Sequence, residues 1–311
     1  MIARIAQMYY IEGQRQADIA AHLRMSQATV SRMLKRAQAE EIVRTTVVAP
    51  SGTYADLEAA LRKKYGISEA IVVECSEDRD GAIMARIGEA AAHFLEVTLQ
   101  AGEIIGVSSW SETILKMVDN IHPMKAGKAK YVVQTLGGMG DPTVQIHANQ
   151  LTTRLARLTG AEARLLTAPG VTQSREAKLV LTSDPYIRET ADLFGKVSLA
   201  IVGIGAMQPS SMLARSGNVF SSRELAEIAE AGGVGDISLR FFKRDGSIVK
   251  TALDERVIGM TLEEHGRVDR VIALAGGEAK TAAIRGALMT GVIDILITDK
   301  FTAGKLSSAE N

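Results

Sequence analysis

The chain has 311 residues and a mass of 33.2 kDa, a length that favours two domains of unequal size over one small domain. Apolar residues make up 46% of it, which excludes wholesale disorder, and 36 basic against 36 acidic residues exclude a uniformly basic coat for nucleic acid. The single cysteine, Cys75, excludes an internal disulfide, and no apolar run is long enough to span a bilayer. The start of the chain shows no secretory signal, so we expect a cytoplasmic protein that makes no membrane contact.

Charge is distributed unevenly along the chain. Residues 1–44 hold seven basic and four acidic side chains, a net charge of +3, so the remaining residues carry a net charge of −3. Four basic residues and no acidic one lie between Arg24 and Arg36. This asymmetry predicts that the N-terminal segment meets a polyanion.

Apolar spacing in the first 44 residues predicts three short helices. Gly13 ends the first of them, the second covers residues 16–23, and the third runs from Gln27 to about Ala39 after Ser26, a good N-cap. Residues 42–48 read as a strand that would form a small wing. The pattern predicts a winged helix-turn-helix domain over residues 1–50.

The polar face of the third helix is suited to the major groove of DNA, which admits one helix. We expect base contacts from Gln27, Ala28, Ser31 and Arg32, with Thr29 on the same turn, and phosphate contacts from Lys35 and Arg36. Two alternatives are the solvated face of an ordinary three-helix bundle and a module for protein interaction, which the basic, acid-free stretch of residues 24–36 disfavours.

Residues 54–311 alternate between strand and helix patterns, which predicts a Rossmann-like α/β domain with a parallel sheet. The expected strands are 70–74, 103–108, 131–136, 163–167, 198–204, 236–242, 270–275 and 294–298. The expected helices are 54–65, 80–99, 112–121, 144–158, 185–194, 222–231 and 279–290.

Ligands of such sheets bind beyond the carboxyl ends of the strands, which directs attention to the loops there. Hydroxyls cluster in the loop that contains Ser109, Ser111 and Thr113, although Ser111 could simply cap a helix. Gly137 and Gly138 could admit a ligand or serve a tight turn. Asp236 suits sugar hydroxyls. Residues 276–280 contain two glycines followed by Lys280. This segment could bind an anion, or Lys280 could simply be a solvated lysine on the first turn of a helix.

No catalytic set or metal-ligand spacing stands out among the five histidines and Cys75. The glycines of residues 203–205 resemble a dinucleotide fingerprint, but its third glycine is missing and Pro209 intervenes. We therefore expect no metal and no cofactor.

Several motifs in a consistent order resemble the SorC family of bacterial sugar-responsive transcriptional regulators. They are SQATVSRMLK near the N-terminus, then IGVSSWSET, VVQTLGG, VGIGA, GDISLRFFKRDG and AGGEAKTAAIRGAL. The resemblance covers essentially the whole chain. It implies an effector domain related to sugar-phosphate isomerases, a homotetramer or homodimer that binds operator DNA, and an effector surrounded by Ser111, Thr113, Gln134, Asp236 and Lys280.

Glu112 departs from the small or basic residues that are commoner in that family, and a carboxylate beside a phosphate would repel it. Two possibilities follow. The effector is an unphosphorylated compound such as a polyol, or it is phosphorylated and Glu112 points away from it. The loop also resembles that of erythritol-catabolism regulators.

We therefore predict a transcriptional regulator, a repressor or an activator, that controls carbohydrate catabolism genes in response to a sugar, sugar alcohol or sugar phosphate. The alternative is a sugar-phosphate isomerase or deaminase with an accessory module, for which Asp236 and Glu278 would be the candidate acid and base.

Overall fold

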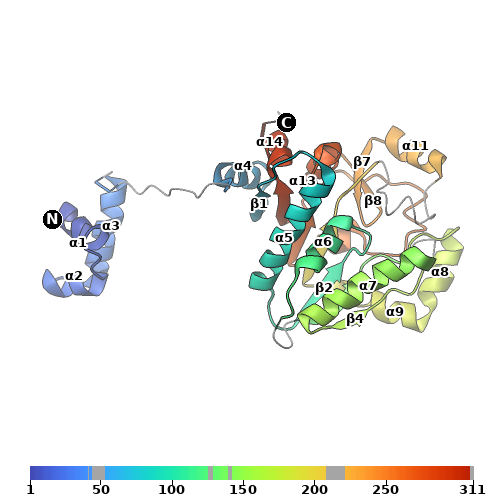
Figure 1. Cartoon of the computed structure of the whole chain (residues 1–311), viewed down its shortest axis with the longest axis horizontal. Helices are drawn as coiled ribbons and strands as arrows, with labels where there is room; N and C mark the ends of the chain where they lie inside the picture. Colours follow the sequence, from blue (N-terminus) through green and yellow to red (C-terminus); the bar gives the residue numbers. More distant parts are fainter. Residues whose placement is uncertain (41, 44–52, 125–128, 139–141, 208–220, 309–311) are drawn as a thin grey trace. The chain divides into compact units, whose positions relative to one another are not determined.

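A computed structural model describes the chain except for residues 41, 44–52, 125–128, 139–141, 208–220 and 309–311 (Figure 1). The chain divides into two compact units, Met1–Ser51 and Gly52–Asn311.

The first unit contains helices α1 (Ile2–Tyr10), α2 (Gln16–His22) and α3 (Gln27–Ala39). Arg24 takes a positive φ of 53° in the tight turn between α2 and α3. Ser26 caps α3 as predicted, because its side chain accepts a hydrogen bond from the Thr29 amide at 3.2 Å.

One apolar cluster holds these three helices together. Its buried members are Ile5, Ala6, Met8, Ile19, Ala20, Val30, Leu34 and Ala37. The strand predicted over residues 42–48 is absent at residues 42 and 43, the two that the structure describes. Ile42 and Val43 form a bend, because the Val43 amide donates to the Ala37 carbonyl at 3.1 Å and turns the chain back onto the end of α3. Residues 44–48 lie outside the described part of the chain.

The second unit is built on a seven-stranded parallel sheet of order β1-β10-β9-β5-β2-β3-β4. The strands are β1 (Glu69–Val73), β2 (Glu103–Val107), β3 (Ala129–Gln134), β4 (Glu162–Arg164), β5 (Leu199–Gly203), β9 (Arg270–Leu274) and β10 (Ile295–Asp299). The predicted parallel α/β architecture is thereby confirmed.

Helices cover both faces of this sheet (Figure 1). One face packs on α5 (Asp80–Thr98), α6 (Glu112–Asn120) and α7 (Pro142–Thr159). The other packs on α4 (Ala55–Tyr65), α9 (Pro185–Ala191), α12 (Leu262–His265), α13 (Thr281–Met289) and α14 (Lys300–Ser308). Successive β5 residues alternate between these cores, Leu199 and Ile201 on the first face and Ala200 and Val202 on the second, so a continuous apolar run is required.

Helix α8 (Arg175–Ser183) and the 3-10 turns η1 (Phe194–Lys196) and η2 (Glu278–Lys280) complete the connections around the sheet. Sequence periodicity missed α8 because none of its residues is buried, so its apolar side chains form no inward stripe.

The order of the strands creates a topological switch point between β2 and β5. From β2 the chain proceeds outward through β3 and β4, whereas from β5 it proceeds in the opposite direction through β9 and β10. In open α/β sheets, ligands bind beyond the carboxyl ends of the strands at such a switch point.

The predicted strand over residues 236–242 is wrong as a single element. The segment forms a hairpin of β7 (Gly233–Ile237) and β8 (Arg240–Lys243), which joins β6 (Gly205–Ala206) in a separate antiparallel sheet and precedes no parallel crossover. Ser238 and Leu239 turn the chain with positive φ angles of 52° and 62°, a conformation that propensity does not anticipate for a non-glycine pair. Helix α11 (Ser222–Glu230) precedes this hairpin.

Candidate functional site

Helix α3 exposes the predicted DNA-contact residues on one side and buries apolar residues on the other. Gln27, Ala28, Arg32, Lys35 and Arg36 are exposed, and Thr29 and Ser31 are half-buried. The half-burial of Thr29 follows from the cap, since its hydroxyl lies 2.8 Å from that of Ser26.

Two of the α3 cations already have partners on the helix. Arg36 forms an exposed ion pair with Glu40 at 2.5 Å, and the Arg32 side chain donates to the Ala28 carbonyl at 3.4 Å. Exposed i,i+4 pairs are weak, so both guanidinium groups can exchange these contacts for others.

The switch point of the second unit brings together loops that are distant in the sequence. A Cβ added at Gly203 would lie 2.7 Å from the Ser111 hydroxyl, so the end of β5 packs directly on the loop after β2. A Cβ added at Gly205 would collide with the Asp236 carboxylate, and one at Gly235 would lie 2.5 Å from the Ala283 Cβ. These close approaches require glycine and bring β6, β7 and the start of α13 against one another.

Asp236 and Lys280 interact electrostatically in this region. Desolvation raises the pKa of Asp236 to about 6, while the Leu239 amide, which donates to its Oδ2 at 2.9 Å, and the nearby Lys280 ammonium oppose that rise. Desolvation lowers the pKa of Lys280, and the carboxylates of Asp236, Asp80 and Glu112 counteract it. The predicted residues Asp236 and Lys280 are therefore near enough to interact electrostatically, and Asp80 and Glu112 also act on Lys280.

The hydroxyl loop after β2 is used mainly within the protein. The Ser109 hydroxyl is buried and lies 2.7 Å from that of Thr152 on α7. Ser111 caps α6 by accepting from the Ile114 amide at 3.3 Å, as the alternative interpretation of this residue held. Thr113 is buried on the first turn of α6.

Gln134 ends β3 with an unsatisfied amide. The residue is fully buried, and its Oε1 accepts from the Leu166 amide at 3.2 Å, but its Nε2 has no hydrogen-bond partner. A buried donor without a partner costs free energy, which a ligand oxygen could recover.

The predicted glycine pair Gly137 and Gly138 permits close backbone packing. The Gly137 amide donates to the Ile258 carbonyl at 3.0 Å, and the Gly138 amide donates to the Ala168 carbonyl at 2.6 Å. A Cβ at Gly137 would lie 2.6 Å from that same Ala168 carbonyl. These contacts pack the pair against residues 168 and 258, which are distant in the sequence, and form no tight turn within residues 137–138.

Two features of this region escaped sequence analysis. Asp80 begins α5 and lies beside Gly277, whose added Cβ would be 2.9 Å from its Oδ1. The Gly277 amide donates to Asp299 Oδ2 at 3.0 Å and to the Thr302 hydroxyl at 2.8 Å. The available signals were an acidic residue after β1 and another directly after the strand predicted at residues 294–298, which Asp299 in fact ends.

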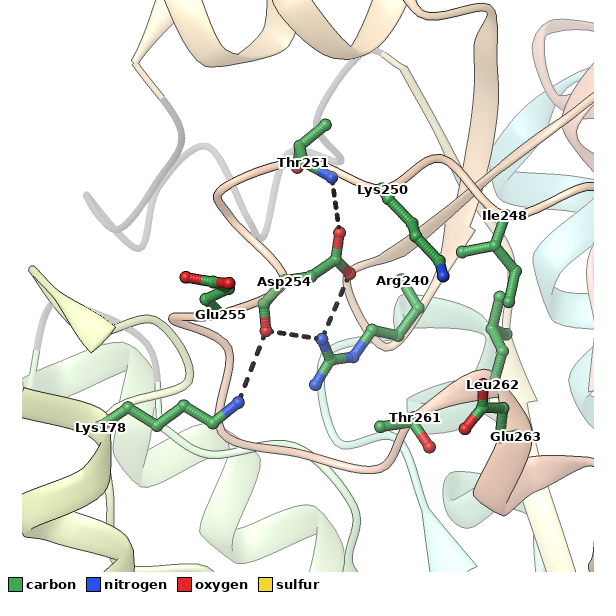
Figure 2. A pocket seen from close by; sticks show the side chains of 10 residues that line it. All are labelled: Lys178, Arg240, Ile248, Lys250, Thr251, Asp254, Glu255, Thr261, Leu262 and Glu263. Atoms are coloured by element: carbon green, nitrogen blue, oxygen red, sulfur yellow. Dashed lines mark hydrogen bonds and ion pairs between the residues drawn. The ribbon is translucent and has the colours of Figure 1, made fainter. Parts of the chain in front are cut away.

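A recess of about 360 Å³ lies beside β8, away from the switch point (Figure 2). Its lining residues are Lys178, Arg240, Ile248, Lys250, Thr251, Asp254, Glu255, Thr261, Leu262 and Glu263. The buried Arg240 guanidinium donates to Asp254 and to the carbonyls of Val257, Gly259 and Met260, at 3.0 to 3.4 Å. Because these acceptors hold the guanidinium, Arg240 serves to fix the 254–260 segment.

Within the described residues, no group of three or more His, Cys, Asp or Glu side chains is arranged to hold a metal. No helix in the same part of the chain is long and apolar enough to cross a membrane.

Comparison with known proteins is consistent with these features. Residues 50–307 match the family described as "Putative sugar-binding domain". The chain is 31% identical over 301 residues to a deoxyribonucleoside regulator of Bacillus subtilis, covering 97% of this chain and 95% of that protein. It is 30% identical over 312 residues to an erythritol catabolism regulatory protein of Brucella abortus, covering 99% and 96%.

The fold matches that of a solved relative along nearly its whole length. The full-length sorbitol operon regulator SorC of Klebsiella pneumoniae superposes with a TM-score of 0.75 at 26% identity, covering 99% of this chain and 98% of that one. These similar proteins are transcriptional regulators and not enzymes, so the isomerase or deaminase alternative is the weaker one.

The pKa of Asp236 generates a prediction about stability. The folded state binds a proton near pH 6 and the unfolded chain only near pH 3.8, so wild-type stability should rise as pH falls between these values. Relative to Asp236→Asn, which keeps an acceptor for the Leu239 amide, we expect the wild type to gain about 2 kcal/mol from pH 6.5 to 4.5. Urea unfolding at each pH measures this difference, and parallel stability curves would contradict it.

Proposed function

Because the chain belongs to the sugar-binding domain family of transcriptional regulators, we propose that it reads operator DNA through α3 and senses a carbohydrate at the β2/β5 switch point. It is a regulator with a sugar-binding domain, as the similarity along its whole length shows. The observation that carries the DNA assignment is the Ser26-capped α3, which buries Val30, Leu34 and Ala37 and exposes its cationic face.

The start of α3 would enter the major groove. Gln27, Ala28, Ser31 and Arg32 would contact base edges, with Thr29 on the same turn, whereas Lys35 and Arg36 would contact phosphates. Amide and guanidinium groups on the first two turns provide the donors and acceptors that base recognition requires.

The effector site would comprise Ser109, Ser111, Thr113, Gln134, Gly137, Gly138, Asp236 and Lys280, as predicted from the sequence. Of these, Asp236, Lys280 and Gln134 have the strongest support, since the first two interact electrostatically and the third has a buried donor without a partner. The effector would bind one conformation of the regulator more tightly than another and thereby alter operator affinity.

We also propose that the protein acts as a homodimer or homotetramer, since helix-turn-helix proteins commonly bind two half-sites. An exposed apolar surface on α8 and α9 supports this proposal. Leu179, Val180 and Tyr186 there are 59%, 70% and 78% exposed. A second copy of the chain would cover them.

For the DNA interface, we expect Arg32→Ala and Lys35→Ala to fail differently. Arg32→Ala should reduce discrimination between selected and random duplexes by about 10-fold or more, because a bidentate base contact contributes about 1–3 kcal/mol. Lys35→Ala should weaken both classes equally and lower the salt dependence by about one phosphate.

Duplexes selected from a random library by the wild-type protein supply the probe, and titration at several salt concentrations supplies the measurement. Arg32→Ala with undiminished discrimination would remove Arg32 from the base contacts. Failure of the wild type to enrich any sequence would refute DNA reading by this unit.

For the effector site, we expect Lys280→Met to abolish stabilisation by the sugar, polyol or sugar phosphate that most raises the wild-type melting temperature. Loss of a charged hydrogen bond should weaken binding about 10- to 100-fold. Lys305→Met is the matched control, since Lys305 lies on α14 in an exposed ion pair with Glu278. Equal ligand affinity in the two variants would exclude Lys280 from the site.

For the assembly, Leu179→Glu combined with Val180→Glu should convert the oligomer into smaller species without unfolding the chain, because both side chains are exposed. Sedimentation velocity measures the species, and the exposed Met289→Glu is the matched control. An unchanged sedimentation coefficient would place the interface elsewhere.

A further inference from the structure

The charges around the proposed effector site indicate what it can bind. Phosphate sites in α/β proteins combine free backbone amides at helix N-termini with cations. Along the carboxyl ends of the strands, two helices already begin with carboxylates from the chain itself. Asp80 begins α5, and Glu112 begins α6.

The glycine loop after β9 is likewise occupied by an internal anion. Its Gly277 amide donates to the fully buried Asp299 carboxylate, which also accepts from the Phe301 and Thr302 amides at 2.9 Å. A Cβ at Gly276 would collide with the same carboxylate. The segment predicted as an anion cradle therefore already holds an anion.

Lys280 interacts electrostatically with three carboxylates, and one of them, Asp80, lies beside Gly277, three residues before Lys280. The carboxylates of Asp236, Asp80 and Glu112 all act on its ammonium group. A phosphate dianion added beside them would meet like charges, and the desolvation of Asp236 shows that screening by water is reduced near that carboxylate.

The groups that remain for a ligand are suited to hydroxyls. Carboxylates accept hydrogen bonds from hydroxyl groups, and the ammonium group of Lys280 can donate to one. The Gln134 Nε2 is buried without a partner. The Ser238 hydroxyl, two residues from Asp236 in the turn that Asp236 braces, is also buried without a partner.

We propose that the effector is an uncharged polyhydroxylated compound, a free sugar or sugar alcohol, and that Asp80 and Glu112 exclude its phosphorylated form. The proposal rests on the location of the effector site proposed above and adds the ligand class. It assigns a role in specificity to Asp80, on a helix that the sequence analysis did not connect with the site.

The experiment compares the full-length wild type with Asp80→Asn/Glu112→Gln, and with each single variant in case the double variant does not fold. The probes are inorganic phosphate, with chloride at matched ionic strength, and the pairs erythritol and erythritol 4-phosphate, sorbitol and sorbitol 6-phosphate, and ribose and ribose 5-phosphate. Calorimetry gives affinities, and the same proteins with Lys280→Met report whether binding occurs at this site.

We expect the wild type to show no saturable binding of phosphate and to bind at least one free compound more tightly than its phosphomonoester. Removal of the two carboxylates should raise affinity for phosphate and phosphomonoesters at least 10-fold, and this gain should disappear with Lys280→Met.

Lys280-dependent binding of a phosphomonoester to the wild type, tighter than its free parent, would overturn the ligand class while leaving the site in place. A double or single variant that folds but gains no phosphate affinity would also overturn it. Absence of Lys280-dependent binding by every probe would reject both the ligand class and the site, whereas DNA selection by α3 would be unaffected.

Discussion

The close approach of three segments at Gly203, Gly205 and Gly235 is the constraint on which the large unit depends. Parallel strands β2 and β5 place their loops side by side, but only the absence of a Cβ lets Ser111, Asp236 and Ala283 come this near. Asp236 is thereby held in a desolvated position, where it interacts electrostatically with Lys280. The small antiparallel sheet of β6, β7 and β8 thus supplies a carboxylate that the parallel sheet alone would not place there.

The two units differ in the charge that they present at their proposed ligand sites. In the N-terminal unit, the cations of α3 face solvent, where attraction to phosphates is strong and depends on salt. In the large unit, carboxylates lie near the carboxyl ends of the strands, and Asp236 among them is desolvated. Under the ligand class proposed above, a protein with no net charge attracts a polyanion at one unit and repels small phosphorylated metabolites at the other.

The sequence predicted most of the fold because its patterns are local. Uninterrupted aliphatic runs such as residues 199–202 indicated strands buried on both faces, and Ser26 indicated the start of the recognition helix. The hairpin at Ser238 and Leu239 was missed because its positive φ angles depend on the Asp236 brace and not on residue type. Lys280 and Asp236 could be nominated from strand ends, but the roles of Asp80 and Asp299 depend on contacts between β1, β9 and β10 that only the folded chain provides.

Hydrogen–deuterium exchange of the full chain would test the location of the effector site most directly. With the free sugar or polyol that most stabilises the protein, protection should appear in residues 108–114, 203–207, 235–239 and 277–283 around the switch point. Protection confined to residues 248–263, which border the Arg240 recess, would contradict an effector site at the switch point and would place that site in the Arg240 recess.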